Sequence, residues 1–252
     1  RWLERAAELG HDRARTELGR LLVAQDPAAG LAWLEAAARD GDVDAQRQLG
    51  QLLQRGARGI EARPRQAAVW LREAAKQGDP SAQAWLGWAY DTGAGVAADP
   101  RRALRWYRRA ARRGNVTAQV NLALLYQQGR GTPRREDLAR RWFERAAARG
   151  EVAALSSLAW LLATAPDPDV RDAPRALSLA RAAVAEQEDS QTLEALAAAL
   201  AESGRFAEAV KEQQRALELL EDASGAGTDV AVRSALEDRL AAYLEERAWR
   251  EP

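Results

Sequence analysis

Tryptophan and small residues recur along the first part of the chain in a fixed order. Each tryptophan is followed four and five residues later by two alanines, then by a glycine, and four residues after the glycine by another alanine. A Leu-Gly or Leu-Ala pair comes one turn later, and apolar residues spaced by three and four are typical of a helix face. The marking tryptophans are Trp2, Trp33, Trp70, Trp106 and Trp142, separated by 31, 37, 36 and 36 residues. A period of this length predicts stacked two-helix repeats.

The repeat predicts an alternation of first and second helices. First helices are expected near residues 13–25, 43–55, 80–92, 116–128, 152–164 and 190–203, and second helices near 28–39, 64–77, 100–113, 134–149, 172–187 and 206–221. Three helix starts combine an N-capping aspartate with a first-turn proline, at Asp26-Pro27, Asp79-Pro80 and Asp99-Pro100. No segment alternates apolar and polar residues with a period of two, so no sheet is expected.

The residue types within a unit also predict how its two helices pack. Small residues at helical spacing allow the helices to approach at the short end of the usual range of about 8–10 Å. We expect the tryptophan of each unit to fill the wider space one turn away. The glycine after each second helix suits the left-handed position that ends a helix. These glycines are Gly10, Gly41, Gly78, Gly114 and Gly150.

One unit carries a family resemblance most clearly. Its residues are Ala82, Leu86-Gly87, Tyr90, Gly93-Ala94-Gly95-Val96, Asp99, Ala103, Trp106, Ala110-Ala111 and Gly114. This unit resembles the Sel-one-like repeat, a longer relative of the tetratricopeptide repeat, from which the Gly93-Ala94-Gly95-Val96 loop separates it. The fourth unit keeps Gly129-Arg130-Gly131, the second extends the loop to Gly56-Ala57-Arg58-Gly59, and the first lacks it.

Beyond residue 165 the pattern resembles ordinary tetratricopeptide repeats. The matching residues are Leu196-Ala197, Leu200, Gly204, Phe206, Ala209 and Ala216, whereas Gln213 replaces the usual large aromatic of the second helix. Asp222 to Asp229 is expected to form a loop. A last helix with Val232, Leu236, Leu240, Tyr243 and Leu244 on one face is expected to cap the array, since a solenoid needs a terminal element with a polar exterior.

The resemblance implies an all-α, right-handed α-α superhelix of about six helix-turn-helix repeats plus a C-terminal capping helix. We expect Sel-one-like repeats over residues 1–165, the first of them truncated, tetratricopeptide-like repeats over 166–223 and the capping helix over 229–249, in one continuous solenoid. Because Arg1 lies inside a repeat, residues are expected to precede it. The family is widespread in bacteria, so a bacterial source is expected.

Composition excludes several kinds of chemistry. The 252 residues include no Cys and a single His, His11, so thiolate catalysis, a Ser-His-Asp triad and a multi-histidine metal site are not expected. His11 is expected in an exposed turn. Gly93-Ala94-Gly95 lacks the Gly-Lys-Ser/Thr of a phosphate loop and follows a helix, so it is interpreted as a turn. We expect no catalytic residue, no metal and no cofactor.

Charge is distributed unevenly although the formal net charge is zero. Residues 1–150 hold 27 basic and 17 acidic side chains, a net +10, and residues 151–252 hold 10 and 20, a net −10. The basic excess lies in two second helices, and the candidate anion-binding belt consists of Arg101, Arg105, Arg108, Arg112, Arg141, Arg145 and Arg149. This belt is either a solvated convex surface or a site for an anionic partner.

In tetratricopeptide-like solenoids the first helices line a concave groove. Carried over position by position, the resemblance implies groove residues Arg20, Arg47, Gln51, Ala84, Trp88, Val120, Leu124, Ser156, Trp160 and Glu194. The groove would be basic at one end, apolar in the middle and acidic at the other, and aromatic side chains on such a surface are typical binding anchors. The alternative is that Trp88 and Trp160 pack between repeats.

These observations favour a non-catalytic scaffold or adaptor that binds a protein or extended peptide in the groove. One alternative is a module that binds a polyanion or a membrane surface through the arginine belt. Another is the superhelical scaffold part of a larger cell-wall enzyme. Nucleic acid is the least favoured partner because no base-recognition module is present. No apolar run is long enough to span a membrane, so we expect a soluble protein of the bacterial cytoplasm or periplasm. The sequence leaves its partner, pathway and oligomeric state open.

Overall fold

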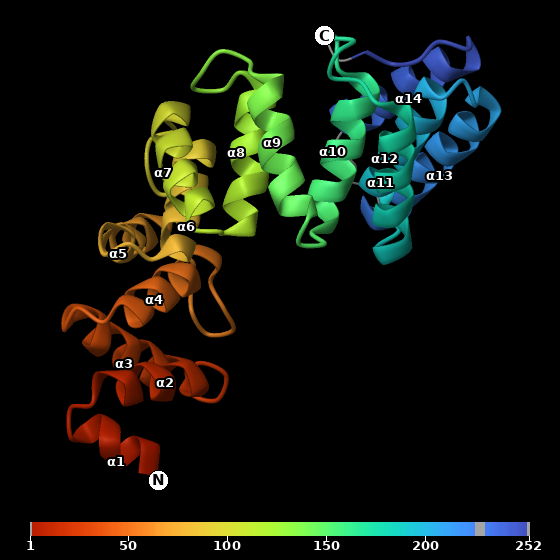
Figure 1. The fold of residues 1–252 in the computed structure, drawn as a ribbon. Coiled ribbons are helices and arrows are strands. Elements are labelled where there is room, and N and C mark those ends of the chain that lie inside the picture. The colour runs from red at the N-terminus through yellow and green to blue at the C-terminus, as the bar shows by residue number, and fades with distance from the viewer. Residues whose placement is uncertain (1, 225–229, 251–252) are drawn as a thin grey trace. The chain divides into compact units, whose positions relative to one another are not determined.

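The computed structural model describes residues 2–224 and 230–250, and these form fourteen α-helices and no strand (Figure 1). A single isolated bridge pairs Ala57 with Ile60 inside a loop. The helices are α1 (Trp2–Glu8), α2 (Asp12–Leu22), α3 (Pro27–Arg39), α4 (Val43–Arg55), α5 (Pro64–Lys76), α6 (Pro80–Thr92), α7 (Pro100–Arg112), α8 (Val116–Gln128), α9 (Glu136–Ala147), α10 (Val152–Thr164), α11 (Ala173–Glu186), α12 (Ser190–Glu202), α13 (Phe206–Ser224) and α14 (Val230–Leu244). The all-helical fold predicted from the repeat is therefore confirmed.

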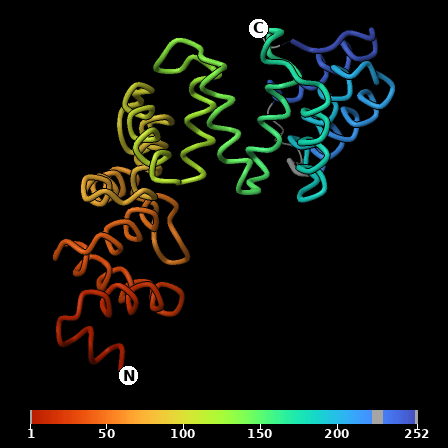
Figure 2. The backbone as a smooth tube through the Cα atoms, viewed as in Figure 1, coloured from red at the N-terminus to blue at the C-terminus, as the bar shows by residue number. Residues whose placement is uncertain are grey.

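The chain divides into two compact units, Arg1–Arg134 (unit 1) and Arg135–Pro252 (unit 2). Figure 2 shows the backbone of each unit as a succession of helical hairpins. The boundary lies in the loop before α9, inside the segment 1–165 that the sequence assigns to one repeat type. The single continuous solenoid remains a prediction.

Asx side chains cap the starts of seven of the described helices. Each accepts a hydrogen bond from the backbone N–H three residues later, which satisfies one of the donors left free in a first turn and stabilises the helix by about 1 kcal/mol. The capping residues are Asp26, Asp42, Asp79, Asp99, Asn115, Asp172 and Asp189. The three predicted Asp-Pro starts are among these caps.

In unit 1 the two helices of a repeat meet at the glycine of the Leu-Gly pair. A Cβ added at Gly87 in α6 would lie 2.7 Å from Tyr107 Cδ1 in α7, and one added at Gly50 would lie 2.6 Å from Leu71 Cγ. The same contact joins Gly19 to Leu34 at 2.8 Å. Only glycine allows this approach, so the large residue opposite it fills the core.

That large residue is the one after the tryptophan, while Trp33 and Trp70 are partly buried and pack against core clusters. Leu34, Leu71, Tyr107 and Phe143 are fully buried, whereas the tryptophans that precede them are half-buried. Adjacent helical residues point about 100° apart, so a single position faces the glycine. Two of the tryptophans instead stack with an arginine three residues on, Trp106 with Arg109 and Trp142 with Arg145, at 4.6 and 4.7 Å.

In unit 2, α10 packs against α9, α11 and α12, α12 packs against α11 and α13, and α14 packs on α13. Leu193, Ala216 and Leu236 form a buried cluster there. Gln213, which replaces the expected aromatic, is buried and donates from Nε2 to the carbonyl oxygen of Leu236 at 3.0 Å. The capping helix is thus joined to α13 by apolar packing and by one buried amide.

Two details of the C-terminal prediction are wrong. Helix α13 continues through Ser224, so residues 222–224 are helical, while residues 225–229 of the expected loop lie outside the described part of the chain. On α14, Leu236 and Tyr243 are buried as predicted, but Val232 and Leu244 are 43% and 63% exposed. The buried face is rotated toward Arg239, whose side chain pairs with Glu194 of α12.

Candidate functional site

First helices of unit 1 line an open concavity of about 500 Å³. Its residues come from α4, α6 and α8 and from the caps between them. They are Gln51, Gln54, Arg55, Ser81, Ala84, Trp85, Trp88, Asn115, Thr117 and Asn121. The concavity therefore lies on the layer of first helices, where the sequence places the groove.

Helical periodicity explains why these residues share one surface. Ser81, Ala84, Trp85 and Trp88 follow the spacing i, i+3, i+4 and i+7, which lines one face of α6. Thr117 and Asn121 on α8, and Gln51 and Arg55 on α4, are each one turn apart. The opposite face of α6 carries Ala82, Leu86 and Ala89, which are fully buried. One face of α6 is therefore core and the other is available for binding.

Two indoles, one of them stacked with a guanidinium group, form the aromatic part of the concavity. The rings of Trp85 and Trp88 have centroids 5.7 Å apart and an interplanar angle of 77°, an edge-to-face arrangement. The guanidinium carbon of Arg55 lies 4.6 Å from the centroid of the Trp85 ring. Both tryptophans are half-buried, so part of each ring remains accessible.

A smaller concavity of about 260 Å³ continues this surface toward α2 and shares Gln51 and Arg55 with the first. Its other lining residues are Arg20, Val23, Leu34, Gln48, Leu52 and Gly56. Among the described residues that line the two concavities, every charged side chain is an arginine. The surface thus combines positive charge, amide groups and indole rings, which suits an extended segment with acidic and apolar side chains.

The structure brings together part of the predicted groove in unit 1. Gln51, Ala84 and Trp88 line the larger concavity, and Arg20 lines the smaller one while pairing with Glu17 at 2.8 Å. Arg47 is engaged by Asp44 at 2.7 Å and by Asp79 at 3.6 Å.

Val120 and Leu124 on α8 are not among the lining residues of the larger concavity, and Val120 is buried. Sequence reasoning missed Trp85, Arg55 and Asn121. Each lies three or four residues from a predicted position or from a neighbour on the same helix face, so extending that face by one turn would have found them.

In unit 2 the predicted groove residues already have partners within the chain. Ser156 is buried and donates to the carbonyl oxygen of Ala153 at 3.3 Å. The ring of Trp160 lies 4.7 Å from the guanidinium carbon of Arg239, and Arg239 also forms an ion pair with Glu194. The apolar and acidic groove positions of this unit are thus in contact with α14.

The belt arginines differ in how exposed they are. Arg101, Arg105 and Arg112 on α7 are exposed, whereas Arg108 is half-buried and donates to Tyr126 Oη at 2.7 Å. Arg141, Arg145 and Arg149 belong to unit 2 and are also exposed, with Arg145 stacked over Trp142. The exposed part of the belt in unit 1 is therefore a stripe of three side chains on α7.

The titratable groups of unit 1 with shifted pKa values lie between its packed helices and do not line its two concavities. Burial raises the pKa of the Tyr107 hydroxyl, and the Asp91 carboxylate adds to the effect. Burial also raises the pKa of Asp91, against the influence of Arg130. His11 is exposed beside the start of α2. Within residues 2–224 and 230–250, no three His, Cys, Asp or Glu side chains gather as a metal site would require.

No helix in the described part of the chain combines the length and the apolarity needed to cross a membrane.

A comparison with curated proteins gives no match. Solved structures do resemble the chain. A protective antigen of uropathogenic Escherichia coli strains, which displays an SLR fold, is 24% identical with a TM-score of 0.73. That match covers 95% of this chain and 55% of the antigen, so this chain spans little more than half of its length.

Two further bacterial structures show the same fold. A Sel1 repeat protein of Oxalobacter formigenes is 25% identical with a TM-score of 0.70, over 94% of this chain and 68% of that one. A Sel1 repeat protein of Klebsiella pneumoniae, itself described as putative, is 23% identical with a TM-score of 0.51, over 75% and 94%. The Sel1 repeat family model matches residues 1–11, 17–42, 43–79, 80–115 and 116–151, more than half of the sequence. With repeats at these positions and helices packed through their Leu-Gly pairs, the chain belongs to the Sel1 repeat family.

Proposed function

We propose that the protein is a non-catalytic scaffold that binds an extended peptide segment of a partner protein on the concave surface of unit 1. Repeat solenoids of this class typically use such surfaces to bind other proteins. The observation that supports the proposal is the half-buried Trp85–Trp88 pair beside Arg55 in an open concavity of about 500 Å³. Aromatic and arginine side chains in such positions are the residues that dominate binding energy at protein interfaces.

The remaining lining residues favour a peptide in an extended conformation. Gln51 and Gln54 on α4 and Asn121 on α8 carry both donors and acceptors, and α6 lies between these two helices in the chain. An extended backbone presents its N–H and C=O groups at intervals along its length, and side-chain amides satisfy both kinds of group. Arg55 has no ion-pair partner among the described carboxylates, so it is available to an acidic side chain of the peptide.

Substitution of the two tryptophans tests this function. The probe is a display library of random linear peptides selected against the unaltered protein, followed by affinity measurement on the selected peptides. Trp88→Ala is expected to weaken binding about thirtyfold, because truncating an interface anchor costs about 2 kcal/mol. Trp85→Ala is expected to act similarly and also to leave Arg55 without its ring. The melting temperature should change little, since both rings are partly exposed.

Trp106→Ala is the matched control. Trp106 is half-buried and stacks with an arginine at 4.6 Å, as Trp85 does, but it lies on the second helix α7 and does not line the concavity. Its replacement should leave peptide affinity unchanged. If all three variants lost the same peptide affinity, Trp85 and Trp88 would not be specific binding anchors. If Trp88→Ala lowered the melting temperature strongly but left binding intact, Trp88 would be a core residue.

A second candidate function rests on the α7 stripe. Arg101, Arg105 and Arg112 are exposed and form no ion pair with any described carboxylate. A row of uncompensated guanidinium groups attracts polyanions at low ionic strength. Such binding would disappear at moderate salt, whereas peptide binding in the concavity would persist.

A further inference from the structure

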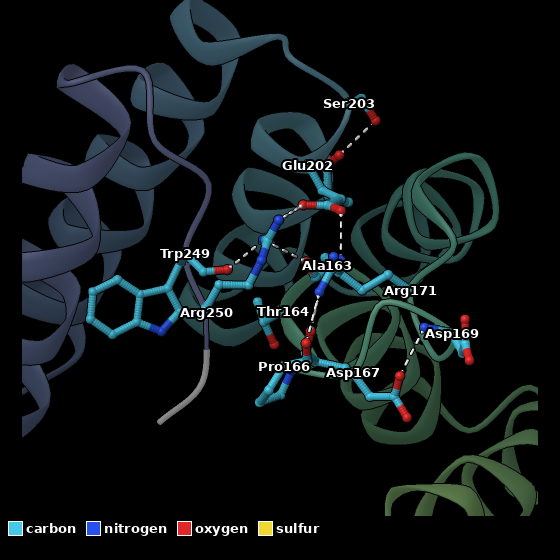
Figure 3. Close-up of polar contacts among 12 residues, drawn as sticks. Ala163, Thr164, Pro166, Asp167, Asp169, Arg171, Glu202, Ser203, Trp249 and Arg250 are labelled. Carbon is cyan, nitrogen blue, oxygen red and sulfur yellow. Dashed lines mark hydrogen bonds and ion pairs between the residues drawn. The ribbon is translucent and has the colours of Figure 1, made fainter.

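The end of unit 2 folds back over its own first helices. After α14 ends at Leu244, residues 247–250, which we call the arm, run without helical structure. Arg250 Nη2 lies 2.7 Å from a carboxylate oxygen of Glu202 in α12, and Arg250 Nη1 lies 3.4 Å from the carbonyl oxygen of Ala163 in α10 (Figure 3). The arm therefore contacts the C-terminal ends of α10 and α12, two first helices of unit 2.

Glu202 is a preorganised acceptor for this contact. Its Oε1 atom lies 3.1 Å from Arg171 Nε, while its Oε2 atom receives Arg250. Arg171 is fixed independently, because its Nη1 donates to the carbonyl oxygens of Ala165 at 2.8 Å and Pro166 at 3.1 Å (Figure 3). Since Arg171 orients the carboxylate, Glu202 keeps an acceptor oxygen toward the arm whether or not the arm is bound.

An aromatic platform lies beside this acceptor. The guanidinium carbon of Arg239 is 4.7 Å from the centroid of the Trp160 ring and 5.6 Å from that of the Trp249 ring. The ion pair with Glu194 holds Arg239 in place, and both side chains are less than one-fifth exposed, at 15% and 18%. Trp249 is thus recognised by a cation that the fold itself positions.

Beyond Arg247, side chains alone hold the arm among the described residues. The backbone hydrogen bonds of the last turn end with Arg247 N to Ala242 O at 2.9 Å, and residues 248–250 form no further backbone–backbone hydrogen bond with described residues. The side chain of Arg250 stays 39% exposed, and ion pairs this open to solvent are weak. Another segment with the same two side chains can therefore take its place.

We propose that Glu202, Arg239 and the carbonyl group of Ala163 form a second peptide site, which we call the arm site. It recognises a partner segment that carries a tryptophan next to an arginine, and the arm is its intramolecular occupant. Its polarity is opposite to that of the unit 1 concavity, because here a carboxylate receives a basic side chain. The proposal rests on unit 2 alone and does not depend on peptide binding in unit 1.

Covalent attachment gives the arm a large advantage over a free segment. A tethered ligand next to its site competes at an effective concentration of the order of millimolar. A free segment of equal intrinsic affinity therefore binds the unaltered chain poorly and binds well once the arm is disabled. A partner segment therefore displaces the arm only if it binds the site more tightly than the arm does or is present at a high enough concentration.

The experiment uses the full chain and a dye-labelled synthetic peptide with the sequence of residues 245–250. In the arm variant, Trp249→Ala and Arg250→Ala are combined. Fluorescence anisotropy should show that the arm variant binds the peptide at least about tenfold more tightly than the unaltered chain. The same peptide with alanine at both positions should not bind. Adding Glu202→Gln to the arm variant should return the affinity to the level of the unaltered chain.

Trp88→Ala in the arm variant should leave this affinity unchanged, which separates the arm site from the concavity of unit 1. Equal binding of the peptide by the unaltered chain and a folded arm variant would overturn the proposal. If circular dichroism shows that the arm variant loses helix, Arg250→Glu serves instead. This change sets a carboxylate against Glu202 and keeps the indole, and it too should increase binding of the peptide at least about tenfold. If neither variant binds the peptide more tightly than the unaltered chain, the arm is a structural part of the cap and not a displaceable ligand.

Discussion

Gly95 and Gly131 show why the loop of the Sel1 repeat needs its second glycine. Both have positive φ, at +80° and +73°, and a Cβ added at either would overlap the carbonyl group at the start of the preceding repeat's second helix, Pro64 and Pro100 respectively. The loop therefore packs directly on the backbone of its neighbour. The first glycine of the loop, Gly93, also has positive φ, but the nearest atom to its added Cβ is 3.5 Å away.

Gly95→Ala and Gly93→Ala form a matched pair of substitutions. Both place a side chain in the left-handed region at a cost of about 1 kcal/mol, but only Gly95→Ala adds a collision with backbone. We expect Gly95→Ala to lower the free energy of unfolding by about 2 kcal/mol more than Gly93→Ala does. Urea denaturation, with the midpoint and slope compared, measures the difference. Equal destabilisation would show that the loop moves freely away from Pro64.

Helix α14 shows how a charged residue can define the inner face of an element. Its leucines and valines predict a buried face centred on Leu236 and Leu240, yet Val232 and Leu244 are exposed and Arg239 is nearly buried. Arg239 contacts Glu194 and two indole rings, so its charge is compensated where it lies. An apolar pattern along one helix does not reveal a counterion on another, and the rotation of the cap follows from that pairing.

Arg239→Ala should therefore destabilise unit 2 strongly. The substitution removes the arginine that pairs with Glu194 in a largely buried place, and losing one member of such a pair costs about 3 kcal/mol. Arg233→Ala on the same helix is the control, because Arg233 pairs with Glu221 and Glu237 while 49% exposed, and surface pairs contribute about 0–1 kcal/mol. Thermal unfolding followed by circular dichroism compares the two. Similar melting temperatures would mean that Arg239 is not central to the cap.

Charge separates the two ends of the sequence, with a net +10 in residues 1–150 and −10 in the remainder. The structure qualifies this difference, because many of these charges are already paired within their own unit. Arg47, Arg102 and Arg130 have carboxylate partners, while Glu194 and Glu202 have arginine partners. The charge available to a polyanion in unit 1 is thus smaller than the sequence indicates, and Arg101, Arg105 and Arg112 supply one exposed row of it on α7.

Charge reversal on α7 tests whether this stripe binds polyanions. Arg101, Arg105 and Arg112 changed together to Glu should abolish retention on heparin at low salt, and salt near the physiological range should elute the unaltered protein because the Debye length is then only about 8 Å. Arg58, Arg63 and Arg65, which are exposed elsewhere in unit 1, receive the same reversal as the control and should leave most retention intact. Absence of retention for the unaltered protein would make the stripe a solvated face.

The sequence by itself determined the helical repeat, because periodic apolar residues, Asx caps and positive-φ glycines are local signals that act within one or two turns. It also indicated the first-helix surface on which Trp88 and Gln51 lie. Only the tertiary structure decided which residue of a neighbouring pair faces the core, as Tyr107 does and Trp106 does not, because that choice depends on Gly87 in another helix. The same holds for Trp85 beside Arg55, and for Arg239 between Glu194 and Trp160. These partners are distant in sequence, and their contacts arise when packing brings their helices together.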